Sequence, residues 1–153
     1  MKVMSVQYTY YETEDKKGKH TFKTNCKVEI WLEETDGIYK CNLEIRPGFK
    51  CDGLSVPVIF RWFLPSWDSK NGLYNLAGVI HDGLYANKGI CIFSREQVDD
   101  IFRGLLRESG ICRFKAGCAD KAVEWFAGGN EHWSSDQYHC KDLIKLKLFK
   151  RMD

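Results

Sequence analysis

A β-hairpin predicted over residues 25–45 constrains the fold more than any other feature of the chain. Its first half, NCKVEIWLEE, alternates apolar and mostly polar residues, with Val28, Ile30 and Leu32 on the apolar side. Asp36-Gly37 supplies a turn signal, and IYKCNLEI then continues with further apolar positions. Pro47-Gly48 ends the pattern. We therefore expect a small antiparallel sheet in the N-terminal third of the chain.

The composition is that of a folded globular chain without a bias toward nucleic acid. The 153 residues are 44% hydrophobic and 29% charged, and 23 basic residues nearly balance 21 acidic ones. This length fits a single domain, 1–153, whose core needs no covalent staple. No apolar run approaches about 18 residues, so we expect no transmembrane helix.

The cysteines predict a reducing environment. There are seven, an odd number, and the N-terminal segment lacks the apolar core of a signal peptide. We therefore expect free thiols, with a disulfide between Cys41 and Cys51 as the alternative. The chain has no Cys-x-x-Cys pair, so a four-ligand zinc site is not supported.

The second part of the chain reads as helical. SREQVDDIFRGLLRESGI has the strongest signals, because Ser94 and Gln97 form a capping box and Gly110 supplies the stop. NGLYNLAGVIHDGLYANKG is helix-like from about residue 73 to 86, but its glycines weaken it, so packing must hold it. RFKAGCADKAVEWFAGGN is a further predicted helix. We expect an α+β fold: mainly strands over 1–52, then helices over 57–129 that include an antiparallel pair. The tail, 130–153, is left open between strand and helix.

His81, Asp82 and Tyr85 stand together in the apolar run AGVIHDGLYANKG. In a helix, His81 and Tyr85 are four residues apart and share a face, and Asp82 is three residues from Tyr85. Ionisable groups buried in such a run cost free energy unless they are paired. The stretch is therefore either a satisfied structural cluster or a chemical site.

Asp99 is the predicted partner of His81. The helix that follows has an apolar stripe formed by Val98, Ile101, Phe102 and Leu105. Asp99 adjoins this stripe, whereas Asp100 is expected on a solvated face. Two helices joined by a short loop lie antiparallel and touch, so an inward Asp99 can reach the histidine.

A contact between His81 and Asp99 has two interpretations. In the first, the carboxylate fixes the imidazole tautomer and the imidazole deprotonates a water, with Tyr85 beside it. Asp82, pointing elsewhere, is then a candidate ligand for a hard cation such as calcium, and Asp52 in the turn CDGLSVP is a further ligand. In the second, the network only ties two helices together, and Asp52 only closes a turn. The pattern leaves both open.

Other candidates are weaker. Four aromatic residues between or beside prolines form a candidate partner-binding patch: Phe60, Trp62, Phe63 and Trp67. His20 lies in a charged turn and is expected to be solvated. His132, His139 and Cys140 do not have the spacing of a standard metal site.

Three blocks resemble the family called domain of unknown function 1353, which is common in bacteriophages and prophages. They are DGLSVP at 52–57, HDGLY at 81–85 and SREQVDDIF at 94–102, and the resemblance covers about residues 45–128. Cys51 and Leu54 stand where threonine and alanine are usual in that family. The resemblance implies a phage-encoded protein that is made in the host cytoplasm, with the virion as an alternative location and other phage proteins as candidate partners.

A weaker resemblance is to phospholipase A-two, in which a His-Asp pair on one helix is backed by an aspartate on the next. It implies that His81 is the base, Asp82 the calcium ligand, and Tyr85 and Asp99 the support. The chain departs from those enzymes because it lacks their glycine-rich calcium loop and helix-bridging disulfides.

Three functions follow as expectations. The first is a water-activating hydrolase that acts on a cell-envelope component; it requires an imidazole of His81 that water can reach. The second is a virion structural protein, a tail or neck component, in which the same cluster braces helices and His81 is sealed from solvent. The third is a small inhibitor of a host protein. Sequence alone does not decide whether the chain is an enzyme.

Overall fold

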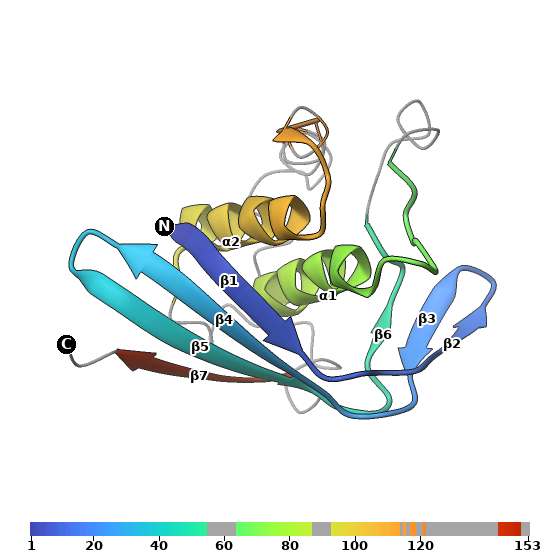
Figure 1. Ribbon diagram of the computed structural model, residues 1–153. Helices are drawn as coiled ribbons and strands as arrows, with labels where there is room; N and C mark the ends of the chain where they lie inside the picture. Colours follow the sequence, from blue (N-terminus) through green and yellow to red (C-terminus); the bar gives the residue numbers. More distant parts are fainter. Residues whose placement is uncertain are drawn as a thin grey trace.

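The computed structural model describes residues 1–54, 64–86, 93–113, 115, 117, 118, 121 and 144–150. Within this part of the chain, two antiparallel sheets and two long helices are formed (Figure 1). Both helices lie over one face of the larger sheet, and the smaller sheet stands at its side. The predicted α+β class is confirmed.

The larger sheet contains the predicted hairpin. Its strand order is β1 (Lys2–Tyr8), β4 (Cys26–Glu34), β5 (Gly37–Ile45) and β7 (Ile144–Lys150), with every neighbouring pair antiparallel. β4 and β5 pair without a shift from Cys26 opposite Ile45 to Glu34 opposite Gly37. The tail left open by the sequence therefore supplies a strand, so the sheet joins the N-terminal third to the end of the chain.

The alternation in β4 gives the sheet one apolar face. Val28, Ile30 and Leu32 are buried, whereas Glu29 and Trp31 between them are half-buried and the flanking Lys27 and Glu33 are exposed. Side chains point to opposite faces of a strand with a period of two, so this pattern fixes which face the helices cover. Cys41 and Leu43 continue the same apolar face on β5.

The smaller sheet consists of β2 (Thr13–Lys16), β3 (Lys19–Phe22) and β6 (Lys50–Cys51), in that order. The charged turn expected near the N-terminus joins β2 to β3 at Lys17-Gly18, both of which have positive φ. Aromatic packing closes this sheet onto the core: the ring of Phe22 stacks with Tyr11 at 5.0 Å between centroids and meets Phe49 edge-on.

The two helices, α1 (Gly72–Ala86) and α2 (Arg95–Glu108), are antiparallel, as predicted. The start of α1 meets the end of α2, because Asn71 Nδ2 donates to the Ser109 carbonyl at 2.9 Å. Tyr85, near the end of α1, contacts the first turn of α2 through Arg95. The start of α1 thus contacts the end of α2, and the end of α1 contacts the start of α2, so the two helices run antiparallel.

α2 begins and ends where the sequence predicts. Both bonds of the capping box are present, from Gln97 N to Ser94 Oγ and from Ser94 N to Gln97 Oε1. Gly110, with φ of 88°, follows the last turn as a stop. The predicted apolar stripe of the helix is buried, with Leu106 added to it.

The core lies between the helices and the larger sheet. Its largest fully buried aliphatic side chains come from both layers and, for Leu64, from the segment before α1: Ile30, Leu32, Ile45, Leu64, Leu76, Ile80, Ile101 and Leu105. Neither of the two long helices in the described residues is long and apolar enough to span a membrane. Cys41 lies in the larger sheet and Cys51 in the smaller one, and no disulfide joins them.

Two further predictions fall mostly on undescribed residues. The helix predicted in RFKAGCADKAVEWFAGGN, residues 113–130, is described at only a few positions. His132, His139 and Cys140 lie outside the described residues altogether.

Candidate functional site

The predicted pair of His81 and Asp99 is formed between the two helices. Nε2 of His81, on α1, lies 3.2 Å from Oδ1 of Asp99, on α2. Eighteen positions separate the two residues in the sequence, and only the antiparallel packing of α1 on α2 brings them together. This contact is the centre of the candidate site.

Tyr85 completes the group expected from the sequence. Its hydroxyl donates to the same Oδ1 of Asp99 at 2.6 Å. His81 and Tyr85 are one helical turn apart on α1, and their rings lie 4.2 Å apart between centroids. One carboxylate oxygen therefore receives two donors from one face of α1.

Arg95 extends the network and had no role assigned from the sequence. Its Nε donates to the hydroxyl of Tyr85 at 3.2 Å, and its guanidinium lies 6.0 Å from the centre of that ring. The signal was present in the spacing, since Arg95 precedes Asp99 by four residues and therefore shares its face of α2. Phe102, one turn further along α2, packs its ring 4.8 Å from that of His81.

The hydrogen bonds decide which nitrogen of His81 carries a proton in the neutral ring. An ionised carboxylate only accepts hydrogen bonds, so the ring nitrogen facing Asp99 must donate. Nε2 is then protonated, and the lone pair of the neutral imidazole lies on Nδ1. The network thus points a basic nitrogen away from Asp99.

Nδ1 faces the neighbouring residue, Asp82. The distance from Nδ1 to Oδ1 of Asp82 is 3.6 Å, which is beyond a direct hydrogen bond but within reach of a water that touches both atoms. The side chain of Asp82 is 46% exposed, whereas that of His81 is only 6% exposed. Asp82 therefore marks the solvent side of the imidazole.

The charges of the network reinforce one another. Burial disfavours the charged form of His81, but the carboxylates of Asp82 and Asp99 outweigh it and raise the pKa of the imidazole. Burial likewise disfavours ionised Asp99, yet the bonds from His81 and Tyr85 lower its pKa. Burial, followed by the bond to Asp99, raises the pKa of Tyr85 to about 12, so its hydroxyl stays a donor at neutral pH.

The turn that contains Asp52 packs on the same helix as His81. Gly53 has φ of 77°, and a Cβ there would overlap the carbonyl oxygen of Ser66. Leu54, which follows it, packs against Gly78 of α1, and a Cβ on Gly78 would come within 2.9 Å of Leu54 Cδ1. Gly78 is one turn before His81, so Gly53 and Leu54 approach α1 close to the block HDGLY.

A metal at this site stays a prediction. Asp82 lies beside Nδ1 of His81, and Asp52 is exposed in the turn after β6. Calcium takes six to eight oxygen ligands in proteins. Among the described residues, no group of three or more carboxylate, imidazole or thiolate side chains is placed to hold a metal ion. Asp52 and Asp82 alone supply too few ligands for calcium.

His20 is buried, so the expectation that it is solvated is wrong. It lies in β3, not in the turn, and is 7% exposed. Its ring stacks on that of Trp67, with 3.8 Å between the ring centroids and 6° between the ring planes. The sequence could not show this, because the contact joins residues 47 positions apart. Of the predicted aromatic patch, Trp67 is therefore half-buried against the core, and Phe60, Trp62 and Phe63 lie outside the described residues.

Asp100 is also less solvated than expected. Its Oδ2 lies 3.2 Å from the amino group of Met1, and its Oδ1 accepts a bond from Arg103. The strand β1 crosses this side of α2 at Gly104, so the face that carries Asp100 is partly covered and the Asp100 side chain is 31% exposed. The adjacent residues Asp99 and Asp100 thus contact different elements: Asp99 faces α1, and Asp100 faces β1.

The fold and the site define an α+β protein in which a His–Asp–Tyr network joins two antiparallel helices. Its sequence matches the family described as protein of unknown function (DUF1353) over residues 29–123, more than half of the chain. The chain belongs to this family. The match includes α1 and α2, and so all the residues of the network. No curated protein and no solved structure shows significant similarity to the chain.

Proposed function

We propose that the chain is a phage-encoded hydrolase that uses His81 to activate water against a component of the bacterial cell envelope. The observation that supports this function best is the shared oxygen of Asp99, which binds both His81 Nε2 and the Tyr85 hydroxyl. That arrangement leaves the basic nitrogen of the imidazole, Nδ1, on the side of the exposed Asp82. A brace between helices requires the bonds to Asp99 but does not require an exposed carboxylate beside Nδ1.

In this proposal, His81 is the only protein group needed for the first step of ester hydrolysis. Nδ1 takes a proton from a bound water as its oxygen forms a bond to the carbonyl carbon of an ester. The resulting tetrahedral intermediate collapses, the bond from carbon to the leaving oxygen breaks, and the imidazolium returns the proton to that oxygen. Asp99 stabilises the imidazolium throughout and does not itself take the proton.

Tyr85 and Arg95 act as positioning residues in this scheme. The Tyr85 hydroxyl fixes the carboxylate of Asp99, and Arg95 holds that hydroxyl from the other side. Because the Tyr85 hydroxyl donates to Asp99 and accepts from Arg95, the orientation of this hydroxyl is determined.

A lipid ester is the first substrate class to test, because the His-Asp-x-x-Tyr spacing resembles that of phospholipase A-two. The proposal uses no metal.

A second function is favoured by one observation, the burial of His81. Its side chain is 6% exposed and contacts the rings of Tyr85 and Phe102, as a brace between helices would require. The corresponding function is a virion structural protein, a tail or neck component that associates with other phage proteins. In this case the network contributes to stability alone.

One experiment separates the two functions. The purified protein is mixed with vesicles of bacterial phospholipids, and separately with peptidoglycan, and released fatty acid or soluble fragments are measured. We expect His81→Gln to lower the rate by about 100-fold or more, since a general base contributes on that scale. His20→Gln is the matched control, because it alters another buried histidine outside the network.

The melting temperatures of the two variants complete the test. The hydrolase is supported if His81→Gln loses activity while its melting temperature falls no further than that of His20→Gln. Full activity in His81→Gln would show that another group is the base. An inactive wild-type protein, with a much larger loss of melting temperature in His81→Gln than in His20→Gln, would establish the brace.

A further inference from the structure

A second candidate site lies where β1 crosses the last two turns of α2. It is a pocket of about 550 Å³ with polar walls. Four cationic side chains contribute to these walls: Lys2, Arg103, Arg107 and Arg113. The carboxylates of Asp100 and Glu108 also line it. The pocket lies on the β1 side of α2, whereas Asp99 faces α1.

The pocket exists because of Gly104. A Cβ at this position would overlap the side chain of Val3, so only glycine lets β1 cross α2 this closely. The strand shows a shift in its pairing with β4 between Val3 and Ser5, directly after this crossing. The close approach places Met1 and Lys2 beside the stripe of Arg103 and Arg107, which are four residues apart on α2.

Most charges of the pocket are already paired. The amino group of Met1 lies 3.3 Å from Glu34 and 3.2 Å from Asp100, and Asp100 also binds Arg103 at 2.5 Å. Lys2 lies 3.3 Å from Glu33. Within the described residues, Arg107, Arg113 and Glu108 form no ion pair. Asp100, beside the N-terminus, is thus neutralised, and the two guanidinium groups of Arg107 and Arg113 outnumber the one carboxylate of Glu108 in the walls of the pocket.

The C-terminus of α2 repels an anion in the pocket only weakly. A helix C-terminus carries negative charge on its unpaired carbonyl groups. Here the carbonyls of Leu105, Leu106 and Arg107 accept bonds from the backbone N–H groups of residues 109–111. These bonds reduce the negative field at the pocket.

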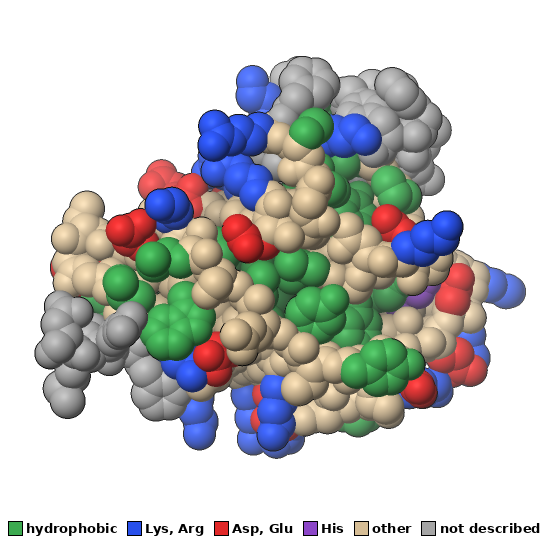
Figure 2. Space-filling model, viewed as in Figure 1, with side chains coloured by type: hydrophobic (Ala, Val, Ile, Leu, Met, Phe, Trp, Pro, Cys, Tyr) green, Lys and Arg blue, Asp and Glu red, His purple; other side chains and the backbone are tan. Residues whose placement is uncertain are grey.

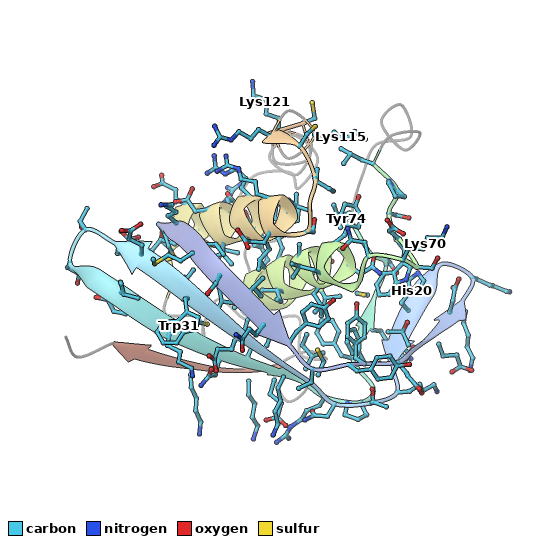
Figure 3. The ribbon with its side chains drawn as sticks, in the orientation of Figure 1. His20, Trp31, Lys70, Tyr74, Lys115 and Lys121 are labelled. Atoms are coloured by element: carbon cyan, nitrogen blue, oxygen red, sulfur yellow. The ribbon has the colours of Figure 1, made fainter. Side chains whose placement is uncertain are left out.

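Further cations continue the surface beyond the pocket. Figure 2 shows lysine and arginine side chains gathered above α2, at the upper part of this face. Figure 3 places Lys115 and Lys121 at the same end of the molecule, past the end of α2. Lys121 is exposed and Lys115 is partly exposed. The excess of positive charge is therefore local, although the whole chain carries a net charge of only +2.

We infer that this pocket binds a phosphate group, through Arg107 and Arg113. A guanidinium presents a planar fork of donors that matches two phosphate oxygens, which a single lysine cannot do. The volume is larger than a phosphate alone requires, so the ligand has a further group attached, as in a soluble phosphate ester or a phospholipid head group. This inference rests on the pocket and is independent of the proposed hydrolase.

The experiment measures binding of two probes to the full chain. Titration calorimetry with glycerol 3-phosphate tests the soluble source, and sedimentation with phosphatidylglycerol vesicles, against phosphatidylcholine vesicles, tests the lipid source. The variant is Arg107→Gln with Arg113→Gln. Lys19→Gln with Lys50→Gln is the matched control, because it removes two exposed cations from the smaller sheet. Circular dichroism checks that both variants are folded.

We expect the arginine variant to bind the preferred probe at least about 10-fold more weakly, and the lysine control to bind it like wild type. Arg107→Lys with Arg113→Lys keeps the charge and should still weaken binding, because it removes the forks. Higher ionic strength should weaken wild-type binding. The inference is overturned if neither probe binds saturably, or if the lysine control weakens binding as much as the arginine variant. Displacement of both probes by a single-stranded RNA would assign the pocket to nucleic acid instead.

Discussion

The two helices that build the candidate site are specified in different ways. α2 has a capping box at Ser94, an apolar stripe and a glycine stop, all within its own segment. α1 has three glycines, at 72, 78 and 83, and no charged residue in its first or last turn that would favour the helix dipole. α2 is therefore favoured by local sequence, whereas α1 depends on what packs against it.

This difference explains where His81 is placed. The glycines that weaken α1 as an isolated helix let neighbouring segments approach it closely, and Gly78 receives Leu54 one turn before His81. His81 thus lies on α1, the helix that packing stabilises, whereas its partner Asp99 lies on α2, the helix that its own sequence favours. The geometry of the network depends on the contacts of α1 more than on those of α2.

The most severe way to disturb α1 is through the turn that packs on it. Gly53→Ala should lower the free energy of unfolding by about 3 kcal/mol or more, because a Cβ meets both a positive φ and the Ser66 carbonyl. Gly18→Ala is the control: its φ is also positive, but no atom lies within 4 Å of the added Cβ. Urea denaturation of both variants measures the difference. Equal losses would show that the contact with Ser66 does not matter.

The N-terminal cap of α1 should matter more than that of α2. Asn71 accepts a bond from Tyr74 N and also donates to the Ser109 carbonyl at the end of α2. Asn71→Ala therefore removes a cap and an interhelical bond together, and we expect a loss of about 2 kcal/mol. Thermal and urea unfolding provide the measurement. A loss below that of Ser94→Ala would contradict the dependence of α1 on its neighbours.

The cap of α2 is a local feature and should have a smaller effect. Ser94→Ala removes the bond from Gln97 N to Ser94 Oγ, which is exposed, and should cost about 1 kcal/mol. Hydrogen exchange should rise in the first turn of α2 only. Increased exchange throughout α1 would show that the two helices unfold together and are not specified separately.

The smallest expected effect is a dependence of stability on pH. The pKa of His81 is raised in the folded protein, so its stabilising contribution is complete below the ordinary histidine value of about 6.5 and is lost as pH rises through the raised value. The pKa of Asp99 is lowered, so its contribution is lost only in acid. Urea unfolding at pH 5.5 and pH 8.5 measures the difference. The free energy of unfolding that His81 contributes should be lower at pH 8.5 than at pH 5.5 in wild type, and this difference should be absent in His81→Gln. A pH dependence that is unchanged in the variant would exclude His81 as its source.

Local signals predicted the parts of the fold that are local. The hairpin of β4 and β5, the limits of α2 and the inward direction of Asp99 follow from spacings of two to four residues. The role of Arg95 was available from the same spacing. Contacts between distant segments were not predictable in this way: the stack of His20 on Trp67 and the pairing of β7 with β5 depend on the assembled fold. Asn71 combines both cases, since its capping position is local but its bond to Ser109 is not.

The place of β7 in the larger sheet has a consequence for folding. β4 and β5 are joined by a tight turn and can pair early, whereas β7 reaches β5 from about 100 residues further along the chain. Until residues 144–150 have been synthesised, one edge of β5 has no strand beside it. An open edge of this kind pairs readily with other chains. Removal of residues 144–150 should therefore produce aggregation during synthesis, before any effect on the His81 network can be measured.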